Sequence, residues 1–375
     1  MEKVRIAVVG LNRGANLAKH ILNYCQKKLD LVAVCDINRE KADNFAKEHS
    51  IGRVYYSLDE LLKEEDIEAV VLATPIPLHA EQVTAVLESG KHVLSEVVSA
   101  LTFDECRKIH AAVKKSGKKY MLEENYCYYR PLTIVKNMAD AGLLGDIYYA
   151  ECDYLMDFNQ RKGFPNSETW RESWRQKVYF DVKGHPYITH SLGPLSYIMN
   201  DKIKSVSCVG AGKLDGIHAD RTCVLLCKTE KGNLIRLRHA FISARPDVYT
   251  YYSLQGSRGC YMGATSEHDI HKVHLRGICN SNEWRNVYDF KGFLPKEWDV
   301  YPEGFFGEFE SSDNCRSQYD HGAPLLLNSF ADAIRNDTTP TVSLDFALNW
   351  TAAGIASQLS AENGGESVEV PSFDI

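Results

Sequence analysis

Two features near the N-terminus have the residue types and spacing needed to bind a dinucleotide. Gly10-Leu11-Asn12-Arg13-Gly14-Ala15 is a glycine-containing turn between an apolar run and a helical pattern. Such a turn presents backbone N–H groups and a helix N-terminus to a pyrophosphate. Asp36 ends the next apolar run, where a carboxylate can hold both ribose hydroxyls and repel a 2′-phosphate. These residues predict an NAD site and favour NAD over NADP, although Arg39 weakens that preference.

The turn departs from the G-x-G-x-x-G/A pattern because Asn12 stands where the second glycine is usual. Asn adopts left-handed backbone angles more readily than most residues, so the turn remains compatible with a dinucleotide. We therefore assign Gly10, Asn12, Arg13 and Gly14 to cofactor binding. The alternative is a Rossmann-like domain that has lost its nucleotide, with Asp36 an ordinary surface carboxylate.

A second group of residues has the chemistry for proton transfer. Tyr187 and His190 are three residues apart, so at a helix start their side chains would face the same side. A free imidazole titrates near neutral pH, which suits proton exchange with a hydroxyl. The alternative for His190 is a capping or core residue. No cluster has metal-ligand spacing, so we expect no metal, and His268, His271 and His274 are predicted to lie in a solvated loop.

Strand and helix patterns alternate up to about residue 125. The apolar runs at 4–9, 31–35, 69–72, 92–94 and 120–122 are typical of buried parallel strands, and helical patterns separate them. This alternation predicts βαβ units and a doubly wound parallel sheet. The fold class is therefore α/β, with an NAD-binding Rossmann domain over residues 1–125.

The pattern changes after residue 145. Strand-like runs follow one another at 147–154, 204–209, 222–228, 234–241 and 249–255, with turn signals between them. Helices are predicted at 191–199, 325–335 and 344–359, and long loops over 262–322. Residues 126–375 are thus expected to form an α+β domain with a large, mostly antiparallel sheet for substrate binding and oligomerisation. An exposed face of that sheet would suit a homo-oligomer.

Composition narrows the function classes. The chain has 375 residues and a net charge of −7 with no long basic block, which argues against a nucleic-acid partner. No apolar run is long enough to cross a bilayer, which argues against a membrane partner. Met1-Glu2-Lys3 leads directly into the first predicted strand, leaving no room for a signal peptide. The 11 cysteines contain no Cys-x-x-Cys pair, so reduced thiols in a cytoplasmic protein are expected.

The stretch from Gly90 to Ser99, which contains Ser95-Glu96-Val97-Val98, resembles the Gfo/Idh/MocA oxidoreductases (glucose-fructose oxidoreductase, inositol dehydrogenase and relatives). Those dehydrogenases usually read Glu-Lys-Pro here, and the lysine handles the substrate proton during hydride transfer. Val97 in that place suggests chemistry other than simple dehydrogenation. The resemblance also implies further cofactor-binding residues, which are Thr74, Pro75, His79, Glu96 and Asn125.

Motifs further along the chain resemble one branch of this superfamily. The carrying motifs are Glu123-Glu124-Asn125-Tyr126, Trp174-Arg175, Gly184-His185-Pro186-Tyr187-Ile188-Thr189-His190-Ser191-Leu192-Gly193-Pro194 and His321-Gly322. They are similar to glycoside hydrolase family 109, the NAD-dependent α-N-acetylgalactosaminidases. The resemblance implies hydrolysis by transient oxidation at C3 of a sugar, elimination across C1 and C2, water addition and re-reduction. Tyr154 matches the tyrosine proposed as the C2 base, and the matched pocket residues are Arg175, Tyr187 and His190.

The roles that the resemblance implies have alternatives, and some residues depart from the family pattern. A tyrosine base needs a nearby cation because free tyrosine has a pKa of about 10, and Arg175 is the candidate cation. Tyr154 has sheet packing as its alternative role, and Arg175 has that of a surface charge. Met156 and Ile188 stand where the family has His and Pro, so the resemblance does not fix which sugar is the substrate. The other functions to consider are an NAD-dependent sugar 3-dehydrogenase and a non-catalytic sugar or nucleotide sensor.

Overall fold

The computed structural model describes residues 2–157, 173–212, 220, 222–245, 250–266, 269–300 and 322–373. The chain forms two compact units. Unit 1 comprises Met1–Glu124, Ala323–Leu348 and Phe373–Ile375, and unit 2 comprises Asn125–Gly322 and Asn349–Ser372. Two residues named above, His268 and His321, lie outside the described residues.

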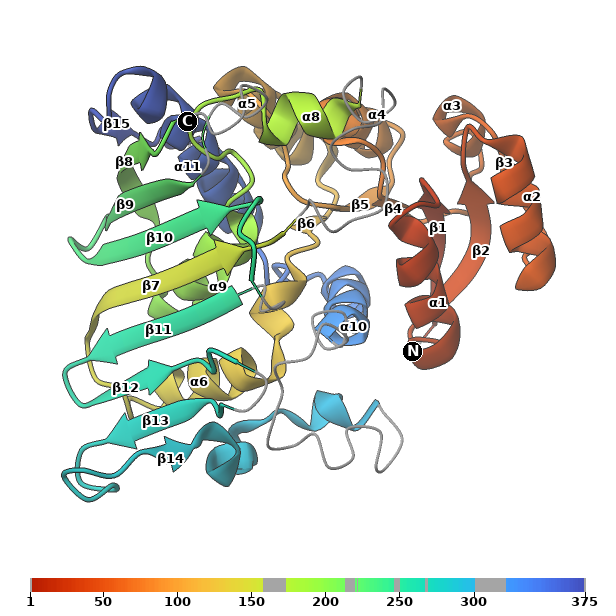
Figure 1. Ribbon diagram of the computed structural model, residues 1–375. Coiled ribbons are helices and arrows are strands. Elements are labelled where there is room, and N and C mark those ends of the chain that lie inside the picture. The colour runs from red at the N-terminus through yellow and green to blue at the C-terminus, as the bar shows by residue number, and fades with distance from the viewer. Residues whose placement is uncertain are drawn as a thin grey trace. The chain divides into compact units, whose positions relative to one another are not determined.

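Unit 1 is built around a six-stranded sheet in which every pairing is parallel (Figure 1). The strands lie in the order β3-β2-β1-β4-β5-β6. They are β1 (Val4–Val9), β2 (Leu29–Cys35), β3 (Val54–Tyr55), β4 (Ala69–Leu72), β5 (His92–Ser95) and β6 (Tyr120–Leu122). Strand β4 is buried along its whole length, as expected of a sheet covered on both faces. The predicted doubly wound Rossmann sheet is confirmed, and its order reverses between β1 and β4.

The helices of unit 1 follow the local sequence signals. They are α1 (Gly14–Tyr24), α2 (Arg39–Glu48), α3 (Leu58–Leu61), α4 (His79–Glu88), α5 (Phe103–Ser116) and α10 (Ala323–Arg335). At the start of α5, Thr102 and Glu105 cap each other's backbone, and Gly117 ends the helix with a φ of 64°. Helix α10 comes from the far end of the sequence, and Asp332 on it pairs with Lys28 at 2.5 Å. Unit 1 thus includes a helix that lies beyond residues 1–125.

Unit 2 contains a nine-stranded sheet in the order β14-β13-β12-β11-β7-β10-β9-β8-β15 (Figure 1). Its pairings are antiparallel except that of β7 with β10, which confirms the mostly antiparallel sheet. The strands are β7 (Ile147–Leu155), β8 (Ile203–Gly210), β9 (Cys223–Thr229), β10 (Leu234–Ala240), β11 (Thr250–Gly256), β12 (Gly259–Met262), β13 (Lys272–Leu275), β14 (Arg285–Asn286) and β15 (Val368–Glu369).

The two faces of this sheet differ. Along β9, Leu225 and Cys227 are buried, whereas Val224 and Leu226 are exposed, as period-two alternation requires. Helix α9 (Thr189–Met199) packs against β7, β10 and β11 on the buried side. The described part of unit 2 also contains α6 (Arg130–Asp140), α8 (Trp174–Tyr179) and α11 (Leu344–Glu362) from Asn349 onward. None of the described helices is long and apolar enough to cross a bilayer.

The prediction of long loops over residues 262–322 is wrong for part of that segment. Strands β13 and β14 extend the sheet there, followed by the 3-10 helices η4 (Val287–Phe293) and η5 (Lys296–Val300). His271 is buried, and its Nδ1 lies 2.7 Å from the Tyr261 hydroxyl, so it does not belong to a solvated loop. His274 lies on β13 and is half-buried. Strands of two and four residues with polar positions contain too few alternating residues to produce a clear sequence pattern.

Candidate active site

The glycine turn of unit 1 has the close packing that a dinucleotide cradle requires. Gly10 follows β1 with a φ of +88°, and a Cβ there would lie 2.6 Å from the carbonyl oxygen of Ala73. Gly14 opens α1, and its Cβ would lie 2.8 Å from a methyl group of Val8. Both positions therefore exclude a side chain, one for the turn and one for helix–strand packing. The residues present fit a bound dinucleotide at this turn.

Asn12 fills the position of the missing glycine without backbone strain. It is not among the non-glycine residues with positive φ, so its tolerance of left-handed angles is not used. Its side-chain oxygen accepts a hydrogen bond from the ammonium of Lys41 at 2.7 Å. The side chain of Asn12 is thus held toward α2.

Asp36 stands at the end of β2, where the sequence predicts the ribose-binding carboxylate. It is 9% exposed. One carboxylate oxygen accepts from the N–H of Leu11 at 2.7 Å and the other from the N–H of Asn38 at 2.8 Å. Each oxygen keeps a second lone pair. The backbone bonds therefore fix the carboxylate and leave it able to accept ribose hydroxyls.

The loop after β4 contains three residues predicted to bind the cofactor. The ring nitrogens of His79 lie 2.8 Å from the carbonyl oxygens of Val98 and Thr74, and its side chain is fully buried. Burial lowers the pKa of His79, whereas the two carbonyl contacts and the charge of Glu96 raise it. The structure thus places His79 as a cross-link between two loops, and Pro75 precedes the 3-10 helix η1 (Ile76–Leu78). Thr74 is half-buried, with its hydroxyl 2.5 Å from Gln82.

Glu96, directly after β5, pairs with Arg13 of the glycine turn. The Nε atom of Arg13 lies 2.7 Å from a carboxylate oxygen of Glu96, and a second guanidinium nitrogen lies 3.7 Å from Glu123. Val97, at the position of the dehydrogenase lysine, is 4% exposed, and the Val97–Val98 peptide is cis. Unit 1 therefore presents a carboxylate and a guanidinium near the turn, and an apolar side chain where a lysine would stand.

In unit 2, the structure brings three of the four predicted catalytic residues together. The Tyr187 hydroxyl lies 2.8 Å from Nε2 of His190, so the predicted same-side pair is hydrogen bonded. The rings of Tyr154 and His190 lie 5.8 Å apart, centre to centre. Tyr154 and His190 are 5% and 8% exposed. A phenol and an imidazole thus lie side by side, largely shielded from water.

The fourth predicted residue, Arg175, is placed differently. It lies in α8, with its guanidinium 4.5 Å above the ring of Trp174. No hydrogen bond or ion pair joins Arg175 to Tyr154 or Tyr187 among the described residues. Tyr179, four residues later in α8, packs its ring 5.0 Å from that of Tyr187. Helix α8 therefore reaches the cluster through an aromatic ring.

Sequence reasoning missed several residues that support this cluster. His239 of β10 and Tyr252 of β11 lie on the two strands that flank β7, and both are buried. Nε2 of His239 lies 2.6 Å from the Ser191 hydroxyl, and the Tyr252 hydroxyl donates to the carbonyl oxygen of His190. The spacing along the chain contains no signal for these contacts, because each joins residues more than 40 positions apart. Asn125 is buried at the start of η2 (Asn125–Tyr128).

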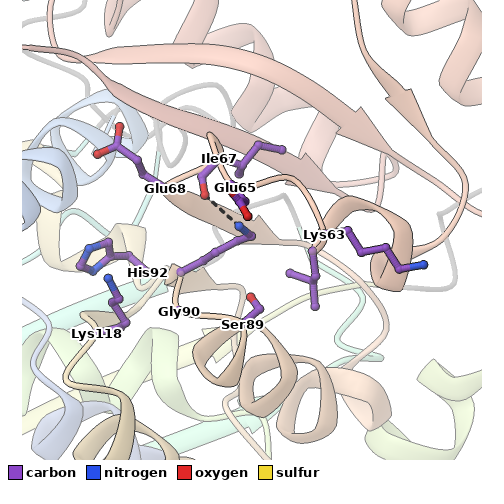
Figure 2. Close-up of a pocket in the computed structure, with 10 residues that line it drawn as sticks. Lys63, Glu65, Ile67, Glu68, Ser89, Gly90, His92 and Lys118 are labelled. Atoms are coloured by element: carbon purple, nitrogen blue, oxygen red, sulfur yellow. Dashed lines mark hydrogen bonds between the residues drawn. The ribbon is translucent and has the colours of Figure 1, made fainter.

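Figure 2 shows a pocket of about 340 Å³ elsewhere in unit 1. It is lined at the amino ends of β4 and β5, where the Lys91 ammonium donates to the carbonyls of Glu64 at 2.6 Å and Ile67 at 3.1 Å. Ligands of doubly wound sheets bind beyond the carboxyl ends of the strands, so we do not assign this pocket to the cofactor. No group of three or more metal-ligating side chains occurs in the described part of the chain.

Comparisons with known proteins agree with these features. Residues 4–124 match the oxidoreductase family with an NAD-binding Rossmann fold. The chain is 27% identical to an alpha-N-acetylgalactosaminidase of Shewanella oneidensis over 410 residues, covering all of this chain and 85% of that protein. A glycosyl hydrolase family 109 protein of Shewanella pealeana is also 27% identical, with coverage of 100% and 86%. The resemblance to the Gfo/Idh/MocA superfamily and its family 109 branch is confirmed.

Solved structures share the whole fold. An oxidoreductase domain protein from Kribbella flavida superposes with a TM-score of 0.82 at 19% identity, covering 99% of this chain and all of that one. Levoglucosan dehydrogenase in complex with NADH gives a TM-score of 0.82 at 18% identity, with the same coverage. The match of residues 4–124 to a family with an NAD-binding Rossmann fold agrees with the predicted NAD cofactor.

Proposed function

We propose that this protein, similar along its whole length to family 109 glycosyl hydrolases, is an NAD-dependent glycoside hydrolase that oxidises its sugar transiently at C3. The observation that carries the proposal is the Tyr187–His190 hydrogen bond beside Tyr154, combined with a buried Val97 in place of the dehydrogenase lysine. Proton transfer then depends on side chains of unit 2 alone.

The cofactor site is assigned to the residues of unit 1 that fit it. Gly10 and Gly14 form the cradle, and Asp36 holds the adenosine ribose. The negative charge of Asp36 disfavours a 2′-phosphate, so NAD binds in preference to NADP. When bound, NAD supplies a reversible hydride acceptor for C3 of the sugar.

His190 takes the proton of the 3-hydroxyl as that carbon is oxidised. Its imidazole is suited to the step because Tyr187, at 2.8 Å, fixes the ring through Nε2. The C3 ketone then acidifies the proton on C2, and Tyr154 removes it. The electron pair left on C2 expels the C1 substituent, and water adds to C1 while a proton returns to C2. Re-reduction at C3 restores the hydroxyl, so the sum of the steps is hydrolysis.

Two other functions make different predictions. An NAD-dependent sugar 3-dehydrogenase would release a 3-keto product and one NADH per turnover. A non-catalytic sensor would bind sugar or nucleotide and convert neither. The family 109 relatives and Val97 favour the hydrolase over the dehydrogenase.

The decisive experiment follows aglycone release and NADH absorbance together on a panel of aryl glycosides in heavy water. The hydrolase releases aglycone without accumulating NADH and places deuterium at C2 of the sugar. Stoichiometric NADH with no deuterium at C2 would instead identify the dehydrogenase. Loss of the C1 substituent through a C2 carbanion depends little on anomeric geometry, so both anomers of one sugar are expected to react.

Variants separate the two proton-transfer roles. His190→Ala should lose both transient NADH and aglycone release, because oxidation comes first. Tyr154→Phe keeps the ring packing and should still form NADH while aglycone release falls by roughly 100-fold, the usual scale for a general base. Tyr149→Phe is the matched control, because alternation along β7 places it on the other sheet face. Wild-type hydrolysis by Tyr154→Phe would make Tyr154 a packing residue.

We also infer that the open face of the nine-stranded sheet joins copies of this chain. Val209, Val224 and Leu226 on β8 and β9 are 62%, 39% and 47% exposed, which is costly for apolar side chains in water. Leu226→Glu should then reduce the mass measured by light scattering to that of a monomer. A wild-type protein that is already monomeric would refute this inference.

A further inference from the structure

Strand β7, which carries Tyr154, lies between β10 and β11 in the sheet. On one side, His239 of β10 is directly opposite Tyr154 in the parallel register, and the two rings lie 5.4 Å apart. On the other side, Tyr252 of β11 is opposite Cys152. His239 and Tyr252 are 0% and 1% exposed, so neither can touch a substrate.

Both residues reach the first turn of α9, which contains His190, the hydrogen-bond partner of Tyr187. Nε2 of His239 lies 2.6 Å from the hydroxyl of Ser191, the residue after His190. The Tyr252 hydroxyl donates to the carbonyl oxygen of His190 itself. These two contacts, which we call the α9 clamp, tie adjacent residues of one helical turn to the strands on either side of Tyr154.

The chemistry of the Ser191 contact selects one tautomer of His239. The Ser191 hydroxyl also lies 2.9 Å from the carbonyl oxygen of Ile188, which can only accept. Nδ1 of His239 is buried and has no hydrogen-bond partner within the described ranges. A proton on Nδ1 would be a buried donor without an acceptor, which is rarer and costlier than an unused acceptor. His239 therefore carries its proton on Nε2 and donates to Ser191, which donates to Ile188.

The environment of His239 keeps this arrangement in place. Burial lowers the pKa of His239 well below its usual range, and the positive charges that His185 and His190 carry when protonated lower it further. The ring is thus neutral, with one donor and one acceptor nitrogen. A neutral ring with a single N–H can direct that N–H only at Ser191.

We propose that His239 is a positioning residue whose bond to Ser191, together with the bond from Tyr252 to His190, holds the Tyr187–His190 pair at a fixed distance from Tyr154. This inference deepens the proposed hydrolase function and rests on it for its kinetic consequence. It assigns His239 no contact with sugar or cofactor. A displacement of about 1 Å in reacting groups costs on the order of 100-fold in rate, so a loosened first turn of α9 should lower turnover.

The test compares His239→Phe, which keeps a buried ring, with Ser191→Ala and the double variant in the full-length protein with NAD. Each single variant should lower kcat by about 10- to 100-fold with little change in KM, and the double variant should be no worse than the more affected single one. Thr222→Val is the matched control, because it removes a hydroxyl bonded to the backbone of His239 without touching α9, and kcat should stay near wild type.

A spectroscopic readout separates this inference from the proposed function. In protein labelled with ¹⁵N-histidine, His239 should give the signals of a ring protonated on Nε2. The exchange-protected proton of the Tyr187–His190 hydrogen bond should disappear or broaden in His239→Phe. An unchanged proton signal in a folded His239→Phe variant would overturn the inference, whatever reaction the enzyme catalyses. If the wild type converts no sugar, the proposed function fails, and the spectra still decide the role of His239.

Discussion

Acid should destabilise unit 2 through His185, a buried histidine in the aromatic core beneath the proposed site. Its ring lies 4.7 Å from that of His239 and meets the edge of Phe241 at 4.4 Å. Burial lowers the pKa of His185 from 6.5 to about 4, and the backbone of Tyr187 raises it to a smaller extent. The folded protein therefore holds His185 neutral at pH values where the unfolded chain would protonate it.

The sign and size of the effect follow from proton linkage. Between about pH 6.5 and 4 the unfolded chain binds more protons than the folded one, so the free energy of unfolding falls as the pH falls. The contribution of His185 is fully present above pH 6.5 and is lost as the pH drops to about 4. From near pH 7 to about pH 5, this one residue accounts for about 2 kcal/mol.

Urea unfolding at these two pH values measures the effect, with tryptophan fluorescence as the signal. All five tryptophans, Trp170, Trp174, Trp284, Trp298 and Trp350, lie in the sequence ranges of unit 2. His185→Phe retains a ring but cannot titrate, so the difference between the two pH values should shrink by about 2 kcal/mol relative to wild type.

The control for this experiment is Ser357→Ala, which breaks the hydrogen bond from the His185 N–H to the Ser357 hydroxyl without removing a titrating group. It should lower stability equally at both pH values. If His185→Phe shows the same pH difference as the wild type, then His185 does not stay neutral in the folded protein and the reasoning from burial is refuted.

Three further predictions concern unit 1. Asp36→Ser removes a charged acceptor and should weaken NAD binding by about tenfold or more in calorimetry, with a smaller loss for NADP; equal losses would mean that Asp36 does not contact the ribose. Gly10→Ala would place a Cβ 2.6 Å from the carbonyl oxygen of Ala73, at a residue whose φ is +88°. Titration with NAD should therefore show no binding, and retained affinity would contradict the cradle assignment. Thr102→Ala removes the α5 cap and should cost about 1 kcal/mol in thermal unfolding, whereas Thr84→Ala, inside α4, should cost less.

Elements with continuous apolar runs or with cap residues were predictable from the sequence. Buried strands such as β4, and helices with caps such as α5, carry their signals within a few residues. Strands β13 and β14 do not, since both contain polar residues and are defined by their pairing with neighbouring strands. The return of α10 to unit 1 could not be predicted either, because an amphipathic pattern defines a buried face and not the core that it covers.

The same limit applies to the site. Helical spacing predicts that Tyr187 and His190 face the same side. Tyr187 lies just before α9, and the structure joins the two side chains by a hydrogen bond. The role of His79 was not predictable. The sequence around a single histidine does not show whether its ring faces a ligand or contacts two backbone carbonyl oxygens. His239 and Ser191 are 48 residues apart, and only the order of the strands brings them together.

Two substitutions relative to the resembling families share a physical consequence. Val97 stands in place of a lysine and Met156 in place of a histidine, and both side chains are buried, at 4% and 6% exposure. Each removes a group that would carry charge in a dry environment, where an unpaired charge is costly. On the proposed function, the proton transfers then fall to Tyr154 and to the Tyr187–His190 pair, whose mutual geometry depends on neutral, hydrogen-bonded neighbours. On the same proposal, the α9 clamp affects turnover because it holds the few side chains that transfer these protons.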